Sequence, residues 1–133
     1  MKKIFITTIV FAITIVVFTG CQKDTTLTIK PTPKVISGPV YFTKVLAPLF
    51  AANCGVAGCH VAGGQAPDFT ASNAYNSIVS TPGLISISNP ESSKLYELMT
   101  GKLSPAMPMG KPSNPSDIND LLLAWIKQGA KKN

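Results

Sequence analysis

The chain of 133 residues has few side chains that can bind a metal or form a covalent bond, and three of them lie close together. Cys54, Cys59 and His60 occur in the segment NCGVAGCH, with the spacing C-x4-C-H. Two thiols followed by an imidazole can attach a cofactor, form a disulfide or bind zinc. His60 is the only histidine, and zinc needs three or four protein ligands, so the pattern does not favour zinc.

The spacing of the two cysteines is compatible with covalent haem attachment. In the common motif C-x-x-C-H, the two thiols add to the haem vinyl groups and the histidine binds the iron. Here two further residues separate the cysteines, and they must bulge outward if both sulfurs are to reach their vinyl groups. Gly55 and Gly58 give the backbone the freedom that such a bulge needs. We therefore expect one covalent haem c on Cys54 and Cys59, with His60 as an iron ligand, and a Cys54–Cys59 disulfide is the alternative.

A second iron ligand is expected from the segment AMPMG. Met107 lies 47 positions beyond His60, which is enough chain to reach the other face of a haem. Its thioether sulfur would raise the reduction potential of the iron. Met109 is the reserve candidate for this position. Met99 lies among leucines at helical spacing, where a methionine usually fills the core.

The N-terminal segment has the features of an export signal. Lys2 and Lys3 precede an apolar run of fifteen residues, Ile4 to Phe18, which is shorter than the roughly 20 residues of a membrane-spanning helix. Small residues then precede Cys21, as in the lipobox of bacterial lipoproteins. We interpret residues 1–20 as a lipoprotein signal peptide and Cys21 as the site of lipidation. The cell envelope is then the expected location, on the periplasmic face or the cell surface.

Composition divides the remaining chain into a linker and one domain. Residues 21–38 are rich in threonine, lysine and proline and show no apolar period, which indicates a flexible linker. Residues 39–133 form the expected domain. The net charge of +6 comes from lysines without any arginine, so nucleic-acid binding is not expected. The lysines can instead attract acidic redox partners, and we expect the protein to be a monomer.

Apolar spacing in the domain predicts short helices with long loops between them. A first helix is predicted around Phe42–Phe50, and Pro48 makes it start late or bend. A second is predicted at 74–79 and a third after Asn89, with Asn89 or Ser92 as its cap. The last is predicted between a cap at Asn114 or Ser116 and Gly129, with a stripe formed by five apolar residues, Ile118, Leu121, Leu122, Trp125 and Ile126. No alternating strand pattern is visible.

These features predict an all-α fold of three to five short helices around one haem. So few short helices bury little apolar surface, and domains of this size are marginally stable. A flat apolar cofactor at the centre would complete the core.

Several segments together resemble a known family. The sequence LAPLF before Cys54, the segment NPESSKLY from Asn89, the segment MPMG from Met107 and the last helix are similar to class I c-type cytochromes, in particular to planctomycete-type cytochrome c domains. The resemblance implies Cys54 and Cys59 as thioether anchors, His60 as proximal ligand and Met107 as distal ligand. It also implies that Trp125 packs the last helix against the haem-bearing one. Met109 and the longer cysteine spacing depart from the usual pattern.

A haem iron with two protein ligands has no free position for a substrate. We therefore expect a carrier of single electrons and not an enzyme. A disulfide-stapled envelope lipoprotein that binds a partner without haem is the alternative. A gas-binding sensor, in which Met107 leaves the iron, is a third hypothesis.

Overall fold

The computed structural model describes residues 34–110 and 116–133. The predicted signal peptide (1–20), the predicted lipidation at Cys21 and most of the predicted linker lie outside the described residues, as does the candidate cap Asn114. No helix in the described ranges is long and apolar enough to cross a membrane.

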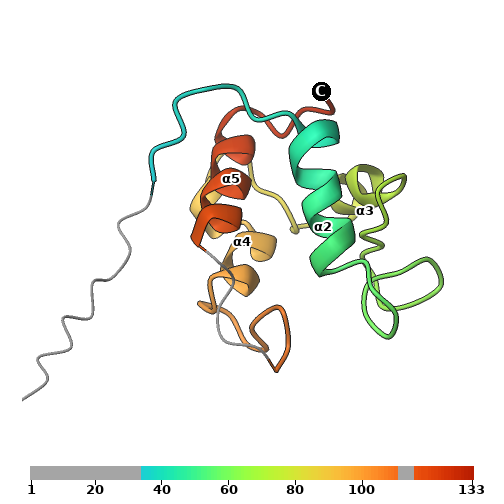
Figure 1. The fold of residues 1–133 in the computed structure, drawn as a ribbon. Helices are drawn as coiled ribbons and strands as arrows, with labels where there is room; N and C mark the ends of the chain where they lie inside the picture. Colours follow the sequence, from blue (N-terminus) through green and yellow to red (C-terminus); the bar gives the residue numbers. More distant parts are fainter. Residues whose placement is uncertain (1–33, 111–115) are drawn as a thin grey trace, which may run out of the picture. The chain divides into compact units, whose positions relative to one another are not determined.

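The described residues form helices and no strand, which confirms the prediction of an all-α fold. In chain order these are the elements η2 (Phe42–Leu46), α2 (Ala47–Asn53), α3 (Ala74–Ser80), η3 (Pro90–Ser92), α4 (Lys94–Met99) and α5 (Ser116–Lys127). Figure 1 shows α3 against α2 and α4 against α5, and the turn η2 that leads into α2 contacts α5.

The first helix changes its geometry where Pro48 requires it. The π-helical turn η2 runs directly into α2, and the N–H of Ala47 still bonds to the carbonyl of Phe42. Pro48 then occupies one of the first two positions of α2. The N–H groups at the start of an α-helix have no partner within it, so proline, which has no N–H, is tolerated there. The wider turn before proline therefore lets the apolar stripe continue, and Phe42, Leu46 and Phe50 are all buried.

The last helix agrees with its prediction. In α5 the side chains of Ile118, Leu122, Trp125 and Ile126 are buried, whereas Leu121 is partly buried and packs at the margin of the core. The helix ends before Gly129, whose φ of 93° only glycine adopts readily.

Trp125 joins the first helical segment of the domain to its C-terminal residues in the core. Its ring centroid lies 5.0 Å from that of Phe42, and its indole N–H donates to the carbonyl oxygen of Lys131 at 2.8 Å. Tyr75 of α3 meets Phe42 edge-on at 5.2 Å. The contact between α5 and the helix before Cys54 thus agrees with the one that the resemblance implied.

The start of α4 differs from the prediction. The predicted helix 74–79 is confirmed as α3. Asn89 is the N-cap residue of the short helix η3 but makes no side-chain cap bond. The helix α4 begins separately after Ser93, its own N-cap residue, which makes no side-chain cap bond either. The hydroxyl of Ser93 is fully buried and instead accepts a hydrogen bond from the N–H of Ser86 at 3.0 Å. The Ser93 side-chain oxygen that could have capped α4 is therefore used in a contact between two loops.

Residues 34–40 run along α5 before they enter η2. The N–H of Lys34 donates to Asp120 Oδ2 at 2.8 Å. The side-chain amide of Gln128 donates to the carbonyl of Gly38 at 3.0 Å and accepts from the N–H of Val40 at 2.8 Å. Residues 34–38, which we assigned to the linker, are therefore attached to the last helix.

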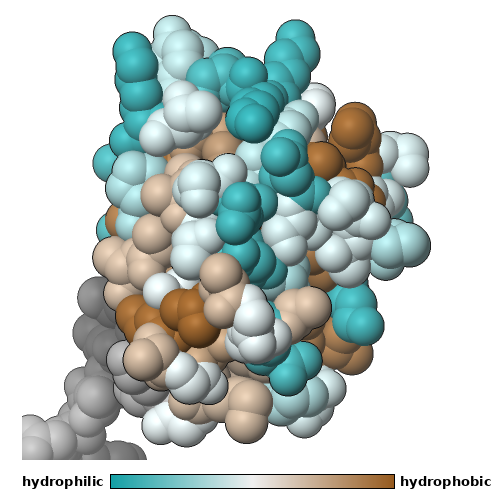
Figure 2. Space-filling model, turned by 90° about the vertical axis from the view of Figure 1, so that its right-hand side faces the viewer, coloured by the Kyte–Doolittle hydropathy of each residue, from teal (hydrophilic) through white to brown (hydrophobic). Residues whose placement is uncertain are grey.

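Two long loops carry the candidate site residues. The loop after α2 holds Cys54, Cys59 and His60, and the loop after α4 holds Met107; both lie at the lower end of the coloured ribbon in Figure 1. Figure 2 shows the face formed by the side of α3 and the loop after α2, on which hydrophobic residues form small separate patches.

Candidate functional site

The two additional residues between the cysteines form a compact turn. Cys54 is the C-cap of α2, and its N–H bonds to the carbonyl of Phe50 at 2.8 Å. The N–H of His60 returns to the carbonyl of Cys54 at 3.1 Å, and the N–H of Cys59 donates to the carbonyl of Val56 at 3.0 Å. Gly58 has a φ of 80°, a conformation that the turn needs and that glycine adopts without strain.

Both thiols of this loop are free, and they differ in their surroundings. Cys54 is half-buried and Cys59 is exposed. Burial raises the pKa of the Cys54 thiol to about 11, with a smaller contribution from the negative charge of the neighbouring Cys59 thiolate. Cys54 is therefore a protonated thiol at neutral pH, and Cys59 is the more accessible of the two.

The imidazole of His60 is oriented by two backbone carbonyls. Its Nδ1 lies 3.1 Å from the carbonyl oxygen of Gln65 and 3.0 Å from that of Pro67. A carbonyl only accepts, so Nδ1 carries the proton and donates. In the neutral ring Nε2 then has a lone pair, and Nε2 makes no hydrogen bond within the described part of the chain. This is the tautomer in which a histidine binds a metal through Nε2.

Phe69 packs against the ring of His60. The two ring centroids are 5.0 Å apart at a steep angle of 69°, and the N–H of Phe69 donates to the carbonyl of His60 at 2.8 Å. The buried Phe69 ring also packs against Phe50 of α2 at 5.0 Å. A Cβ at Gly55 would lie 2.8 Å from the carbonyl oxygen of Phe69, so the loop contacts Phe69 more closely than any side chain would permit.

The carboxylate of Asp68 attaches the same segment to α3. Its Oδ1 accepts from the N–H and the hydroxyl of Thr70 at 2.8 and 2.7 Å, and its Oδ2 accepts from the amide of Asn73 at 2.8 Å. The backbone N–H of Asp68 donates to Ser77 Oγ at 2.7 Å. The hydrogen bonds from Thr70 and Asn73 hold the pKa of Asp68 below its usual value.

Our reading of the sequence missed the residues that hold His60. Gln65 and Pro67 orient the imidazole and Asp68 anchors the segment, and none of the three was among the candidate site residues. One signal was present in the sequence: an aspartate two residues before a threonine forms the side-chain-to-backbone turn typical of such pairs.

The structure distinguishes the two candidate methionines. The N–H of Met107 donates to the carbonyl of Leu98, in α4, at 2.9 Å, and Met107 is half-buried. Met109 is 67% exposed. Leu103 in the same loop and Val56 in the cysteine loop are also exposed large apolar residues. Both loops thus present apolar surface, which is costly to leave in water.

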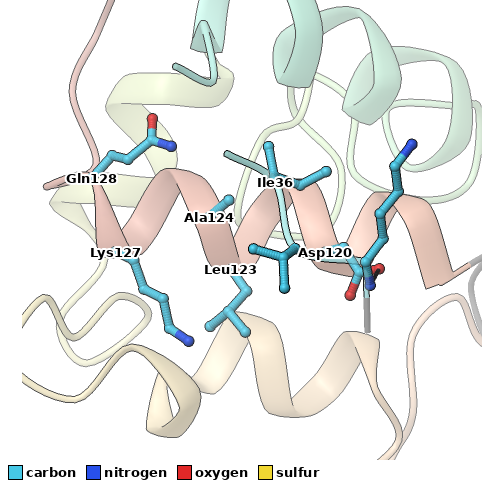
Figure 3. Close-up of a pocket in the computed structure, with 8 residues that line it drawn as sticks. Ile36, Asp120, Leu123, Ala124, Lys127 and Gln128 are labelled. Carbon is cyan, nitrogen blue, oxygen red and sulfur yellow. Dashed lines mark hydrogen bonds between the residues drawn. The ribbon is translucent and has the colours of Figure 1, made fainter. Parts of the chain in front are cut away.

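A hollow elsewhere in the domain contains none of the candidate ligands. It lies between residues 34–36 and α5, where Ile36, Leu123 and Ala124 form its apolar part and Asp120, Lys127 and Gln128 its polar part (Figure 3). Nor do three or more His, Cys, Asp or Glu side chains of the described ranges group closely enough to hold a metal ion. Cys54, Cys59 and His60 therefore lie in one loop but do not converge on a single point.

No protein-family model, no curated protein and no solved structure matches this chain. Two free thiols and an imidazole with its Nε2 lone pair available fit a haem bound at several separate atoms. They fit a zinc ion less well, because zinc needs its ligands around one point.

Proposed function

We propose that this chain is a monohaem c-type cytochrome that carries single electrons at the cell envelope. The observation that supports this most strongly is the orientation of His60. The residue directly after Cys59 donates from Nδ1 to two carbonyls, at 3.0 and 3.1 Å, and keeps Nε2 for a metal.

Four residues would hold the cofactor. Cys54 and Cys59 supply thiols for two thioether bonds, His60 supplies Nε2, and Met107 supplies a thioether sulfur. When bound, a haem iron with both axial positions filled supplies reversible one-electron exchange. Met107 is preferred to Met109 because it is half-buried and anchored to α4, whereas Met109 is 67% exposed.

The surrounding residues orient the ligand and exclude water. The carbonyls of Gln65 and Pro67 share the Nδ1 proton, which makes Nε2 a better electron donor. Phe50 and Phe69 form the apolar floor of the loop. Exposed apolar residues in both loops would be covered when a flat apolar group lies between them.

The proposal places the domain on a lipid anchor. Lipidation of Cys21 would hold it at a bacterial membrane, on the periplasmic face or the cell surface. The expected partners are redox proteins, and acidic ones would be attracted by the lysines, which give the whole chain a net charge of +6. The chain would act as a monomer.

A spectrum and a mass test the proposal. The full chain is expressed with and without the genes for c-type haem maturation and purified from membranes. For wild type expressed with the maturation genes, we expect a pyridine haemochrome spectrum typical of two thioether bonds and a mass increased by one haem. Neither signal should appear without these genes or in the Cys54→Ala/Cys59→Ala variant. Met109→Leu is the control and should keep both signals. If wild type expressed with the maturation genes is colourless and its mass is lowered by two hydrogens, it carries the Cys54–Cys59 disulfide, and the proposal is ended.

A separate measurement tests the carrier function. If His60 and Met107 fill both axial positions, the reduced protein should not bind carbon monoxide readily. Rapid formation of a carbon monoxide adduct would favour the gas-binding hypothesis, in which Met107 leaves the iron.

A further inference from the structure

We propose that Asp68 is a positioning residue that fixes the direction of the His60 imidazole, and that it acts through the backbone of residues 65–69. This inference deepens the proposed function: only if His60 binds the haem iron does the direction of its imidazole matter for iron ligation, and in that respect the inference rests on the proposed function. The geometry that carries it concerns the imidazole alone.

One short segment holds His60 on two sides. Gln65 and Pro67 accept from the ring Nδ1, and Phe69 donates from its N–H to the His60 carbonyl at 2.8 Å. The Phe69 ring contacts the imidazole edge-on. The direction of Nε2 is thus determined by where residues 65–69 lie.

This segment contains little regular structure of its own. It lies in a loop, and of its residues only Phe69 is buried in the core. A loop with few buried side chains opens more easily than a helix. Some other contact must therefore keep the Pro67 carbonyl in place.

Asp68 supplies this contact. It directly follows Pro67, and four hydrogen bonds of 2.7 to 2.8 Å join it to Thr70, Asn73 and Ser77. Two of these partners are Asn73, the N-cap residue of α3, and Ser77, within α3. The helix is itself fixed by Ala74 and Ile78, both fully buried. Asp68 therefore connects the carbonyl that orients His60 to α3 in two ways: its carboxylate accepts from Asn73 at the start of the helix, and its backbone N–H donates to Ser77 within the helix.

The presence of a single histidine makes the test specific. We would label the full mature chain with ¹⁵N-histidine, so that the only signals come from His60, and measure the tautomer and the solvent exchange of the Nδ1 proton by NMR under reducing conditions. In wild type we expect a fixed Nδ1–H tautomer and slow exchange. In Asp68→Asn we expect exchange to be faster by about tenfold or more, because the amide NH2 that replaces Oδ2 cannot accept from Asn73 and the remaining bonds from Thr70 no longer go to a charged group.

Two further variants separate positioning from charge and from folding. Asp117→Asn makes the same change of charge at an exposed position in the first turn of α5, and it should leave the exchange rate unchanged. Asn73→Ala removes one partner without changing the charge and should give a smaller acceleration. If Asp68→Asn does not fold, Asn73→Ala and Ser77→Ala decide the question in its place.

The outcomes are distinct from those of the haem test. The inference is overturned if the exchange rate and the tautomer of Asp68→Asn equal those of Asp117→Asn. If Asp68→Asn does not fold, the same result in both Asn73→Ala and Ser77→Ala overturns it. The absence of a haemochrome spectrum would end the proposed function, whereas the comparison of exchange rates would still be made on the same chain. If haem is bound, the reduction potential gives a second readout: Asn73→Ala, which leaves the charge unchanged, should raise it because a loosened Nδ1 bond makes Nε2 a poorer donor.

Discussion

The Nδ1 of His60 lies 3.0 Å from the carbonyl oxygen of Pro67, seven residues further along the chain. This hydrogen bond selects one tautomer of the only histidine in the protein and directs Nε2 away from the backbone of its own loop. The segment that supplies the carbonyl has no side chain typical of a binding site at positions 65–67. Its role is visible only in the folded chain.

Replacement of Met107 tests the second iron ligand of the proposed cytochrome, in protein that has been shown to carry haem. We expect Met107→Leu to lose the absorption band of an iron–thioether bond. The reduction potential should fall by a measurable part of the roughly 0.8 V range that axial ligands span, because the sulfur that favours the reduced iron is gone. Visible spectroscopy and a redox titration of the purified protein give both values. Met109→Leu is the matched control, and a loss of the band in this variant alone would assign the ligand to Met109.

Gly55→Ala tests the close contact between the cysteine loop and Phe69. The added Cβ would lie 2.8 Å from the carbonyl oxygen and 3.0 Å from the carbonyl carbon of Phe69, and backbone atoms cannot rotate away. We expect the free energy of unfolding to fall by about 1–3 kcal/mol, as for an overpacked core. Urea unfolding followed by circular dichroism measures the change. Gly38→Ala, where nothing lies within 4 Å of the added atom, should be close to wild type. Equal stability of both variants would contradict the contact.

Trp125→Phe tests the link between the last helix and the first. The smaller ring leaves a void beside Phe42, and the carbonyl of Lys131 loses its indole partner. We expect a loss of about 2 kcal/mol in the free energy of unfolding, again from urea titrations. Tyr41→Phe changes an aromatic residue that is 43% exposed and should alter stability by about 0.5 kcal/mol at most. A Trp125→Phe chain as stable as this control would show that the indole is not central to the core.

The two thiols should differ in reactivity in the chain made without haem. The thiolate is the nucleophile, and the pKa of Cys54 is raised from 9.0 to about 11 by burial and by the charge of Cys59. Because the folded state favours the neutral thiol, the thiolate fraction of Cys54 at neutral pH is smaller than that of an ordinary cysteine. We expect alkylation of Cys54 to be slower by on the order of 10- to 100-fold.

Timed alkylation with iodoacetamide and peptide mapping by mass spectrometry measure the rates. Cys59 should be modified first, and the rate at Cys54 should rise with pH until it levels near pH 11. In urea the two cysteines should react alike. Equal rates in the folded chain would mean that Cys54 is not shielded as described.

The sequence alone was sufficient for the parts of the fold that depend on local patterns. The spacing of Ile118, Leu122, Trp125 and Ile126 predicts α5, and the positive φ of Gly129 agrees with its place after the helix. Pro48 predicts a change within the first helix, and the change occurs between Leu46 and Ala47. Apolar periodicity and the backbone limits of proline and glycine act over a few residues, so they can be seen in one sequence.

Tertiary structure decided which atoms meet. Asn89 is the N-cap residue of η3 but makes no side-chain cap bond, and α4 begins after Ser93, whose hydroxyl bonds to Ser86 in another loop instead of capping the helix. The orientation of His60 depends on two carbonyls, and every residue has a carbonyl, so residue type could not indicate Gln65 and Pro67. The spacing of Cys54, Cys59 and His60 determined which chemistry to expect in this loop, and the folding of residues 65–69 against α3 decided which way the imidazole points.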